Sequence, residues 1–141
     1  MEQMGGDRGG DARVVRVLVV DDQAPFRAAA RAVIARVPGF ELVAEATSGE
    51  EAVEMVSRMR PAVVLMDINM GAMDGIEATR IITTTYPDTF VVLVSTYTEA
   101  DMPPAARTCG AATYVNKDEL SPRALRRLWE AGGDPNWRGS P

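Results

Sequence analysis

The feature of this 141-residue sequence that most constrains its fold is a fivefold alternation of short apolar runs with amphipathic segments. Apolar runs rich in β-branched residues indicate strands, and the intervening segments carry helix-start and helix-stop signals. Strands joined through helices run parallel, because the chain must cross over before it pairs again. We therefore predict a five-stranded parallel sheet in a doubly wound α/β sandwich. The predicted strands cover residues 14–20, 40–46, 62–66, 90–94 and 112–115.

Capping and breaking residues place the predicted helices between these strands. Ser48 and Glu51 form a capping box, which marks a helix start. Pro103 and Pro104 cannot lie inside a helix, so the fourth helix is predicted to begin there and to run only to Cys109. Glutamates interrupt the strand at 40–46, which predicts an edge position. The predicted helices cover residues 25–37, 48–60, 75–85, 103–109 and 121–131.

Length and the composition of the two ends predict one domain. Residues 1–13 are rich in Gly and aperiodic, which is typical of a flexible N-terminal arm. The last ten residues are predicted to form a disordered C-terminal tail, because they contain no Ala, Val, Leu, Ile or Met; they read GGDPNWRGSP, at 132–141. The folded domain is therefore expected at 14–131, long enough for its own hydrophobic core.

Composition excludes several classes of function. The chain has no histidine and one cysteine, Cys109, so Ser-His-Asp and Cys-His catalysis and imidazole zinc sites are excluded. Any metal would have oxygen ligands, which favours Mg²⁺ or Ca²⁺. A net charge of −5 argues against binding to nucleic acids or anionic membranes. No apolar run is long enough to span a membrane, and a lone cysteine suits the cytoplasm.

Polar residues follow the predicted strands where the carboxyl ends should share one rim of the sheet. In such folds, ligands bind along this rim. Three carboxylates there would repel one another unless a cation lay between them, and Mg²⁺ with a phosphate would suit them. A lysine and a hydroxyl could bind phosphoryl oxygens, and an aspartate could attack phosphorus. The rim residues are Asp21, Asp22, Asp67, Ser95, Thr96, Asn116 and Lys117.

Four segments carry a resemblance to a known family. They are VLVVDD at 17–22, LMDINM at 65–70 with MDG at 73–75, VS at 94–95, and YVNK at 114–117. The residues Asp22, Asp67, Ser95 and Lys117 lie 45, 28 and 22 residues apart in turn. Over about residues 14–131 the chain resembles the receiver domain of bacterial response regulators, of the type often fused to a LuxR/NarL-like helix-turn-helix. The resemblance implies a flavodoxin-like, CheY-like fold with strand order 2-1-3-4-5.

The resemblance also implies a phosphorelay function. Asp67 would accept a phosphoryl group from a sensor histidine kinase, with Lys117 pairing to the phosphate and Ser95 moving toward it. Tyr114 would rotate inward as a coupled switch. The surface of the fourth helix, fifth strand and fifth helix would then control a protein partner, a homodimer or a fused DNA-binding domain. Beyond accepting the group from a donor and slowly losing it, no enzymatic activity is implied. Mg²⁺ would be held by Asp21, Asp22, Asp67 and the backbone carbonyl of Asn69.

The chain departs from the family pattern in two places. The loop after Asp67 reads Met70-Gly-Ala-Met73, without the proline common in the family, and Pro103-Pro104 shortens the fourth helix. Tyr97 lies two residues after Ser95, where its ring could shield a phosphoryl group from water. We therefore predict slow self-dephosphorylation.

Two other function classes remain open beside the receiver. A phosphatase of the haloacid-dehalogenase type would need a second acid two residues after the nucleophile, but position 69 is Asn. A degenerate module could keep the fold without being phosphorylated. An EF-hand is excluded, because Gly71, Ala72 and Ala78 occupy positions at which it needs an Asp or Asn, a Gly and a Glu.

Partners are less defined by the sequence. Arg123, Arg126 and Arg127 share roughly one face of the last predicted helix, which would suit an acidic partner or simply solvent. No helix-turn-helix pattern follows this helix, so the sequence predicts either a stand-alone receiver or part of a longer transcription factor.

Overall fold

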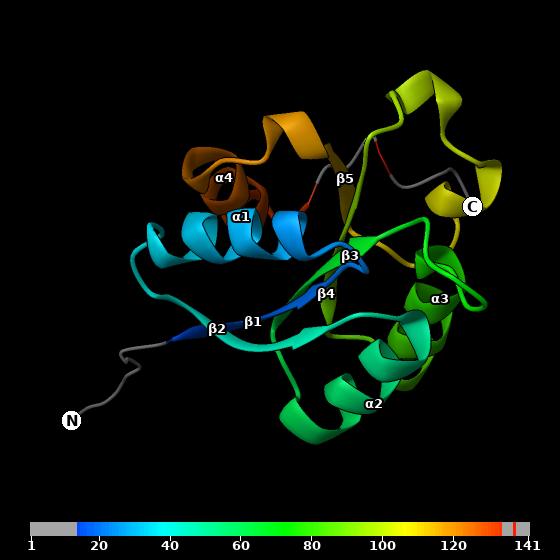
Figure 1. Cartoon of the computed structure of the whole chain (residues 1–141), viewed down its shortest axis with the longest axis horizontal. Coiled ribbons are helices and arrows are strands. Elements are labelled where there is room, and N and C mark those ends of the chain that lie inside the picture. The colour runs from blue at the N-terminus through cyan, green and yellow to red at the C-terminus, as the bar shows by residue number, and fades with distance from the viewer. Residues whose placement is uncertain (1–13, 134–136, 138–141) are drawn as a thin grey trace.

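A computed structural model describes residues 14–133 and Trp137 of the chain as a central sheet between two layers of helices (Figure 1). All strand pairs are parallel, and the order is β2-β1-β3-β4-β5. The predicted fold class and strand order are confirmed, and the strand with two glutamates lies at an edge. The strands are β1 (Val15–Val20), β2 (Phe40–Ala46), β3 (Val63–Asp67), β4 (Phe90–Ser95) and β5 (Thr113–Asn116).

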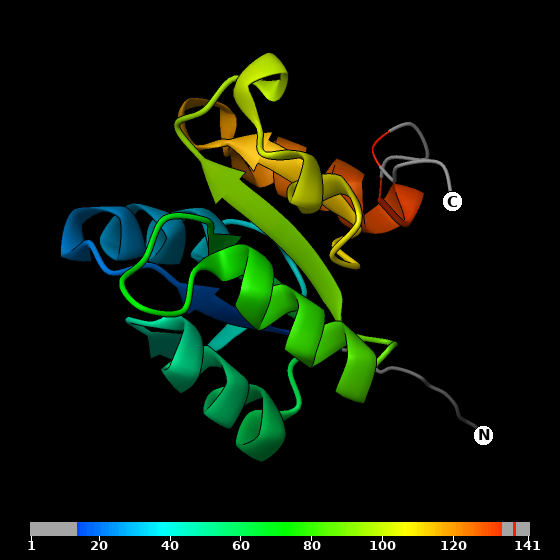
Figure 2. The same cartoon turned by 90° about the vertical axis from the view of Figure 1, so that its right-hand side faces the viewer.

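Four α-helices cover the two faces of the sheet. One face is covered by α1 and α4, and the other by α2 and α3, which lie side by side in both views (Figures 1 and 2). Ser48 caps α2, as predicted, and Ser121 caps α4; each accepts a hydrogen bond from a backbone N–H of the first turn. The bounds are α1 Ala24–Ala35, α2 Gly49–Met59, α3 Gly75–Thr85 and α4 Pro122–Ala131.

The two-residue period of the strands divides the core into two clusters. Val17 and Val19 of β1 pack with the side of α1 and α4, whereas Leu18 and Val20 pack toward α2 and α3. All five residues of β3 are buried, because helices cover both of its faces. A buried central strand therefore ends in Asp67.

The fourth predicted helix is not an α-helix. Its place is taken by two short 3₁₀ segments, η1 (Glu99–Asp101) and η2 (Pro104–Arg107), and a third, η3 (Lys117–Glu119), follows β5. The prediction of a helix at 103–109 is wrong if an α-helix is meant, but it is right that the segment is short. Two prolines remove backbone donors at its start, and Gly110 has φ of 102°, which ends it.

The predicted ends are only partly within the described residues. The arm at 1–13 lies outside them, as do 134–136 and 138–141, so the domain bounds stay a prediction. Trp137 is described and is 2% exposed, which differs from the disorder predicted for the tail at this position. Among residues 14–133, no helix is long and apolar enough to cross a membrane.

Candidate functional site

The strand ends bring the predicted rim residues to one edge of the sheet. Asp21 and Asp22 follow β1, and Asp67 and Ser95 are the last residues of β3 and β4. Lys117 follows β5 and opens η3. Carboxyl ends of parallel strands meet at the same edge, so residues 96 positions apart in the sequence become neighbours. The sequence therefore predicted that Asp21, Asp67 and Lys117 would meet.

Lys117 lies between two carboxylates. Its Nζ is 2.7 Å from Oδ2 of Asp21 and 3.4 Å from Oδ1 of Asp67. The same Nζ lies 4.6 Å from the ring centroid of Phe26 on α1, within reach of a cation–π contact. With a side chain only 15% exposed, Lys117 is a positioned cation rather than a solvated one.

Asp21 is buried completely, whereas its neighbour Asp22 is exposed. Oδ1 of Asp21 accepts a hydrogen bond of 2.8 Å from the backbone N–H of Gln23, and Arg27 donates to the Asp21 backbone carbonyl. One oxygen each of Asp21, Asp22 and Asp67 lies within 4.8 Å of the others. This all-oxygen set fits a hard cation such as Mg²⁺, and its exposed member leaves a side open to water.

The pKa of Asp67 reflects the closeness of the three carboxylates. Burial, and then the negative charge of Asp21, raise the pKa of Asp67 to about 6, against the lowering effect of Lys117. Burial acts to lower the pKa of Lys117, but its hydrogen bond to Asp21 and the charges of Asp67 and Asp21 outweigh it and raise that pKa. An added cation would relieve the repulsion among the carboxylates. Near neutral pH, the three carboxylates of Asp21, Asp22 and Asp67 thus outnumber Lys117, the cation that lies between Asp21 and Asp67.

The loop from Asp67 to Gly75 is tied to the sheet at both ends. Ile68 N–H donates to Val94 O, and Gly75 N–H donates to Ile68 O. A Cβ on Gly75 would lie 1.9 Å from the carbonyl oxygen of Asp67, so only glycine fits this close approach. Asn69 is exposed in this loop. The loop keeps the Asp67 backbone in place although it lacks the expected proline.

Ser95, Tyr97 and Tyr114 form a hydrogen-bonded group beside the carboxylates. Ser95 is buried, and its Oγ accepts a 3.0 Å hydrogen bond from the Tyr97 N–H. The hydroxyl of Tyr114 donates to the backbone carbonyls of Ser95 and Tyr97. Tyr114 is therefore linked to the end of β4 through its hydroxyl, while Thr96 is exposed and makes no described contact with the carboxylates.

Sequence reasoning missed three contacts at this edge. They are the Phe26 ring at Lys117, the Asn116 amide donating 3.1 Å to the Tyr97 carbonyl, and Trp137 against Tyr114. The lone tryptophan in a polar tail was a signal for the last of these. The other two depend on side-chain directions that residue spacing does not specify.

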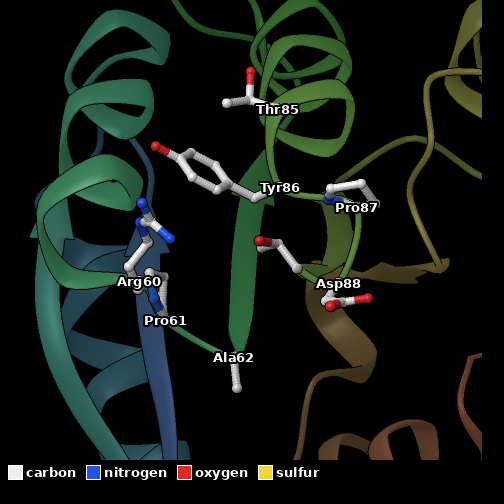
Figure 3. A pocket seen from close by; sticks show the side chains of 8 residues that line it. Arg60, Pro61, Ala62, Thr85, Tyr86, Pro87 and Asp88 are labelled. Atoms are coloured by element: carbon white, nitrogen blue, oxygen red, sulfur yellow. The ribbon is translucent and has the colours of Figure 1, made fainter.

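A pocket of about 440 Å³ lies away from this edge, between Arg60 before β3 and Tyr86 after α3 (Figure 3). The guanidinium of Arg60 lies 4.2 Å from the centroid of the Tyr86 ring. No carboxylate cluster with metal-ligating spacing lies there among the described residues. In the part of the chain that the structure describes, the carboxylates that could hold a metal are those of the strand-end group Asp21, Asp22, Asp67 and Lys117, called the acidic edge below.

A family model, the response regulator receiver domain, matches residues 17–129. The chain belongs to the response regulator receiver family. The resemblance and the receiver function predicted from the motifs are confirmed at this level, and the match includes every residue of the acidic edge.

Individual relatives agree with this assignment. The transcriptional regulatory protein DegU of Brevibacillus brevis is 36% identical over 104 residues, covering 74% of this chain and 44% of the relative. The response regulator domain of Thermotoga maritima CheB has a TM-score of 0.76 and 34% identity, covering 87% of this chain and all of that one. A LuxR-family response regulator from Aurantimonas sp. SI85-9A1 has a TM-score of 0.75 and 31% identity, covering 84% of each chain. The chain spans about half the length of the curated relatives it matches.

Proposed function

We propose that this receiver accepts a phosphoryl group on Asp67 from the phosphohistidine of a sensor kinase. The observation that carries the proposal is the position of Lys117, within 3.4 Å of Asp67 and 2.7 Å of Asp21. A cation fixed beside a nucleophilic carboxylate can bind the oxygens of an incoming phosphoryl group. Family membership and the three grouped carboxylates support the same role.

In the proposed transfer, a carboxylate oxygen of Asp67 attacks phosphorus while the bond from phosphorus to the donor imidazole nitrogen breaks. The imidazole leaves with the electron pair of that bond, and Asp67 becomes an acyl phosphate. Asp67 must be ionised to attack, so its pKa of about 6 permits the reaction at neutral pH and disfavours it in acid. Lys117 and the hydroxyl of Ser95 would then bind phosphoryl oxygens.

Asp21, Asp22, Asp67 and the carbonyl of Asn69 are the proposed ligands of Mg²⁺. The ion would supply positive charge to phosphoryl oxygens beside Lys117. Of the carboxylate ligands, Asp21 is held by Gln23 and Lys117, whereas Asp22 is exposed and can turn toward a cation. The raised pKa of Asp67, caused by burial and by Asp21, supports a site suited to bind a cation.

The proposed output is a change at the surface of η2, β5 and α4, driven through Ser95 and Tyr114. A homodimer across this surface, control of a fused DNA-binding domain, and a protein partner for the arginines of α4 all remain proposals. We place the domain in the cytoplasm, where a histidine kinase would present its phosphohistidine, and propose no enzymatic turnover beyond self-dephosphorylation.

The test is phosphorylation of the purified chain by acetyl phosphate with and without Mg²⁺. We expect a Mg²⁺-dependent gain of one phosphoryl group, assigned to Asp67 by peptide mapping, and no gain in Asp67→Asn. Asp74→Asn is the matched control, since Asp74 caps α3 and is exposed. An unmodified wild-type chain would instead favour a degenerate module that works without phosphorylation.

Slow loss of the phosphoryl group is part of the proposal. Tyr97 is half-buried and packs against the core cluster on the α2–α3 face, so its ring can restrict water at the end of β4. We expect Tyr97→Ala to shorten the phosphoryl lifetime in Mg²⁺. A wild-type lifetime of seconds would contradict slow dephosphorylation.

A further inference from the structure

Trp137 is a buried aromatic residue that lies beyond the last helix. Its side chain is 2% exposed and belongs to the buried cluster on the α2–α3 face. Its ring lies 5.8 Å from the ring of Tyr114, centroid to centroid, with 30° between the planes. Such a contact between aromatic rings stabilises beyond the area that it buries. Trp137 therefore contacts an aromatic residue whose side-chain hydroxyl is hydrogen-bonded to the end of β4.

Arg107 of η2 fixes Trp137 from a second direction. Its guanidinium carbon lies 4.4 Å from the centroid of the Trp137 ring, and its Nη1 donates a 3.0 Å hydrogen bond to the Trp137 backbone carbonyl. One contact orients the indole and the other holds the main chain. Trp137 is thus seated between β5 and η2 through ring and backbone together.

A chain of hydrogen bonds leads from this seat to Ser95, at the end of the strand that pairs with β3 and its terminal Asp67. The Tyr114 hydroxyl donates to the carbonyls of Ser95 and Tyr97, and Ser95 Oγ accepts from the Tyr97 N–H. If Ser95 turns its hydroxyl toward a phosphoryl group on Asp67, it gives up the bond to Tyr97. That change alters the turn at residues 95–97 on which Tyr114 is anchored, and Trp137 rests on Tyr114.

We propose that docking of Trp137 on Tyr114 and Arg107 is coupled to the phosphorylation state of Asp67, and that phosphorylation weakens it. The inference rests on the proposed phosphoacceptor role of Asp67. Because coupling between two sites is reciprocal, a docked Trp137 opposes phosphorylation by the factor with which phosphorylation releases it. Chain segments attached beyond Trp137 would then sense the acidic site through this residue.

The first experiment follows Trp137 directly in a Trp129→Phe chain, in which Trp137 is the only tryptophan. Trp129 packs edge-on against Phe40 and Phe90, and a phenylalanine keeps an aromatic ring there. We expect acrylamide to quench Trp137 weakly at rest, and the quenching constant to rise severalfold with Mg²⁺ and beryllofluoride, which stands in for the phosphoryl group. Adding Asp67→Asn should remove the rise.

The second experiment measures the reciprocal effect. Trp137→Ala and Arg107→Ala should each bind beryllofluoride about fivefold more tightly than wild type in Mg²⁺, at the lower end of typical allosteric couplings. Arg58→Ala is the matched control, because Arg58 is an exposed arginine of α2 whose ion pair with Glu54 lies on the surface. An unchanged affinity in both seat variants would overturn the coupling.

Phosphorylation of Asp67 by acetyl phosphate, measured by intact mass in the same single-tryptophan chain, separates the possible failures. A phosphorylated Asp67 with unchanged quenching overturns the Trp137 inference and leaves the proposed function intact. An Asp67 that accepts no phosphoryl group overturns both. Strong quenching of Trp137 at rest would show that it is not seated, which also overturns the inference.

Discussion

At the carboxyl ends of the strands, Lys117 lies between Asp21 and Asp67, and its side chain is only 15% exposed. Arg60 lies away from this edge, and its exposed guanidinium stacks over the ring of Tyr86. Both regions pair a cation with a nearby aromatic ring, and Arg60 borders a hollow of about 440 Å³. They differ in what surrounds the cation. Only the acidic edge keeps like charges together in a buried setting.

This difference has an energetic meaning. Asp67 has its pKa raised to about 6 because burial and Asp21 disfavour its charged form. A fold selected for stability alone would not retain that arrangement, so the unfavourable electrostatics of Asp67 points to a functional site. Four changes test the comparison, taken from the largest expected effect to the smallest.

Gly75→Ala should cause the largest loss, because the new Cβ would lie 1.9 Å from the Asp67 carbonyl oxygen. Backbone atoms cannot move aside as a flexible side chain can, so we expect a loss of about 4 kcal/mol in the free energy of unfolding. Gly71→Ala is the matched control in the same loop. A Cβ on Gly71 would meet no atom within 4 Å, so the variant should lose only the backbone strain of an alanine at φ +26°, about 1 kcal/mol. Urea denaturation measures both, and equal losses would contradict the close approach.

Asp67→Asn should raise stability near neutral pH by about 3 kcal/mol at most, while abolishing phosphorylation. The pKa of Asp67 is about 6 in the folded chain and 3.8 ordinarily. Between pH 3.8 and pH 6 the folded state therefore holds a proton on Asp67 that the unfolded state has lost. Wild-type stability therefore falls as pH rises through this window, and the whole penalty is present above it. Parallel denaturation of wild type and variant from pH 4 to pH 7.5 measures the difference. A difference independent of pH would contradict the raised pKa.

The acidic edge was predictable from the sequence, because parallel strands deliver their carboxyl ends to one rim. Asp21, Asp67 and Lys117 could be grouped without coordinates on that argument alone. The individual distances were not predictable. Lys117 lies nearer to Asp21 than to Asp67, and residue spacing does not specify the direction of a side chain.

The fourth helical segment and Trp137 show where sequence patterns fail. Two prolines predicted a short helical segment correctly, but the sequence pattern did not show that it would be 3₁₀ rather than α. Trp137 lies among Gly, Pro and polar residues, so local composition predicted disorder. Its burial depends on Tyr114 and Arg107, which are distant in sequence, and local patterns carry no information on such contacts.

Lys117→Met should reduce phosphorylation strongly and lower the free energy of unfolding by about 2 kcal/mol, since two carboxylates lose the cation between them. The pKa of Lys117 is raised, so its contribution is complete below its ordinary value of 10.5 and is lost only above that pH. Without it, the pKa of Asp67 should rise above about 6. Carboxyl-carbon NMR titration of Asp67 measures this shift. Lys117→Arg is the matched control that keeps the charge, and an unchanged Asp67 titration in Lys117→Met would contradict the pairing.

Arg60→Ala should have the smallest effect, a loss of about 0.5–1 kcal/mol, because its contact with Tyr86 is solvent-exposed. Arg60 also adopts φ of +46° at the end of α2, so Arg60→Gly, which accepts this conformation, separates backbone strain from the ring contact. If the ring contact dominates, both variants lose about the same; if the backbone matters, Arg60→Gly is the more stable of the two. Neither variant should change Mg²⁺-dependent phosphorylation of Asp67. A clear change in that phosphorylation would show that the Arg60–Tyr86 region and the acidic edge are energetically connected, and would contradict their independence.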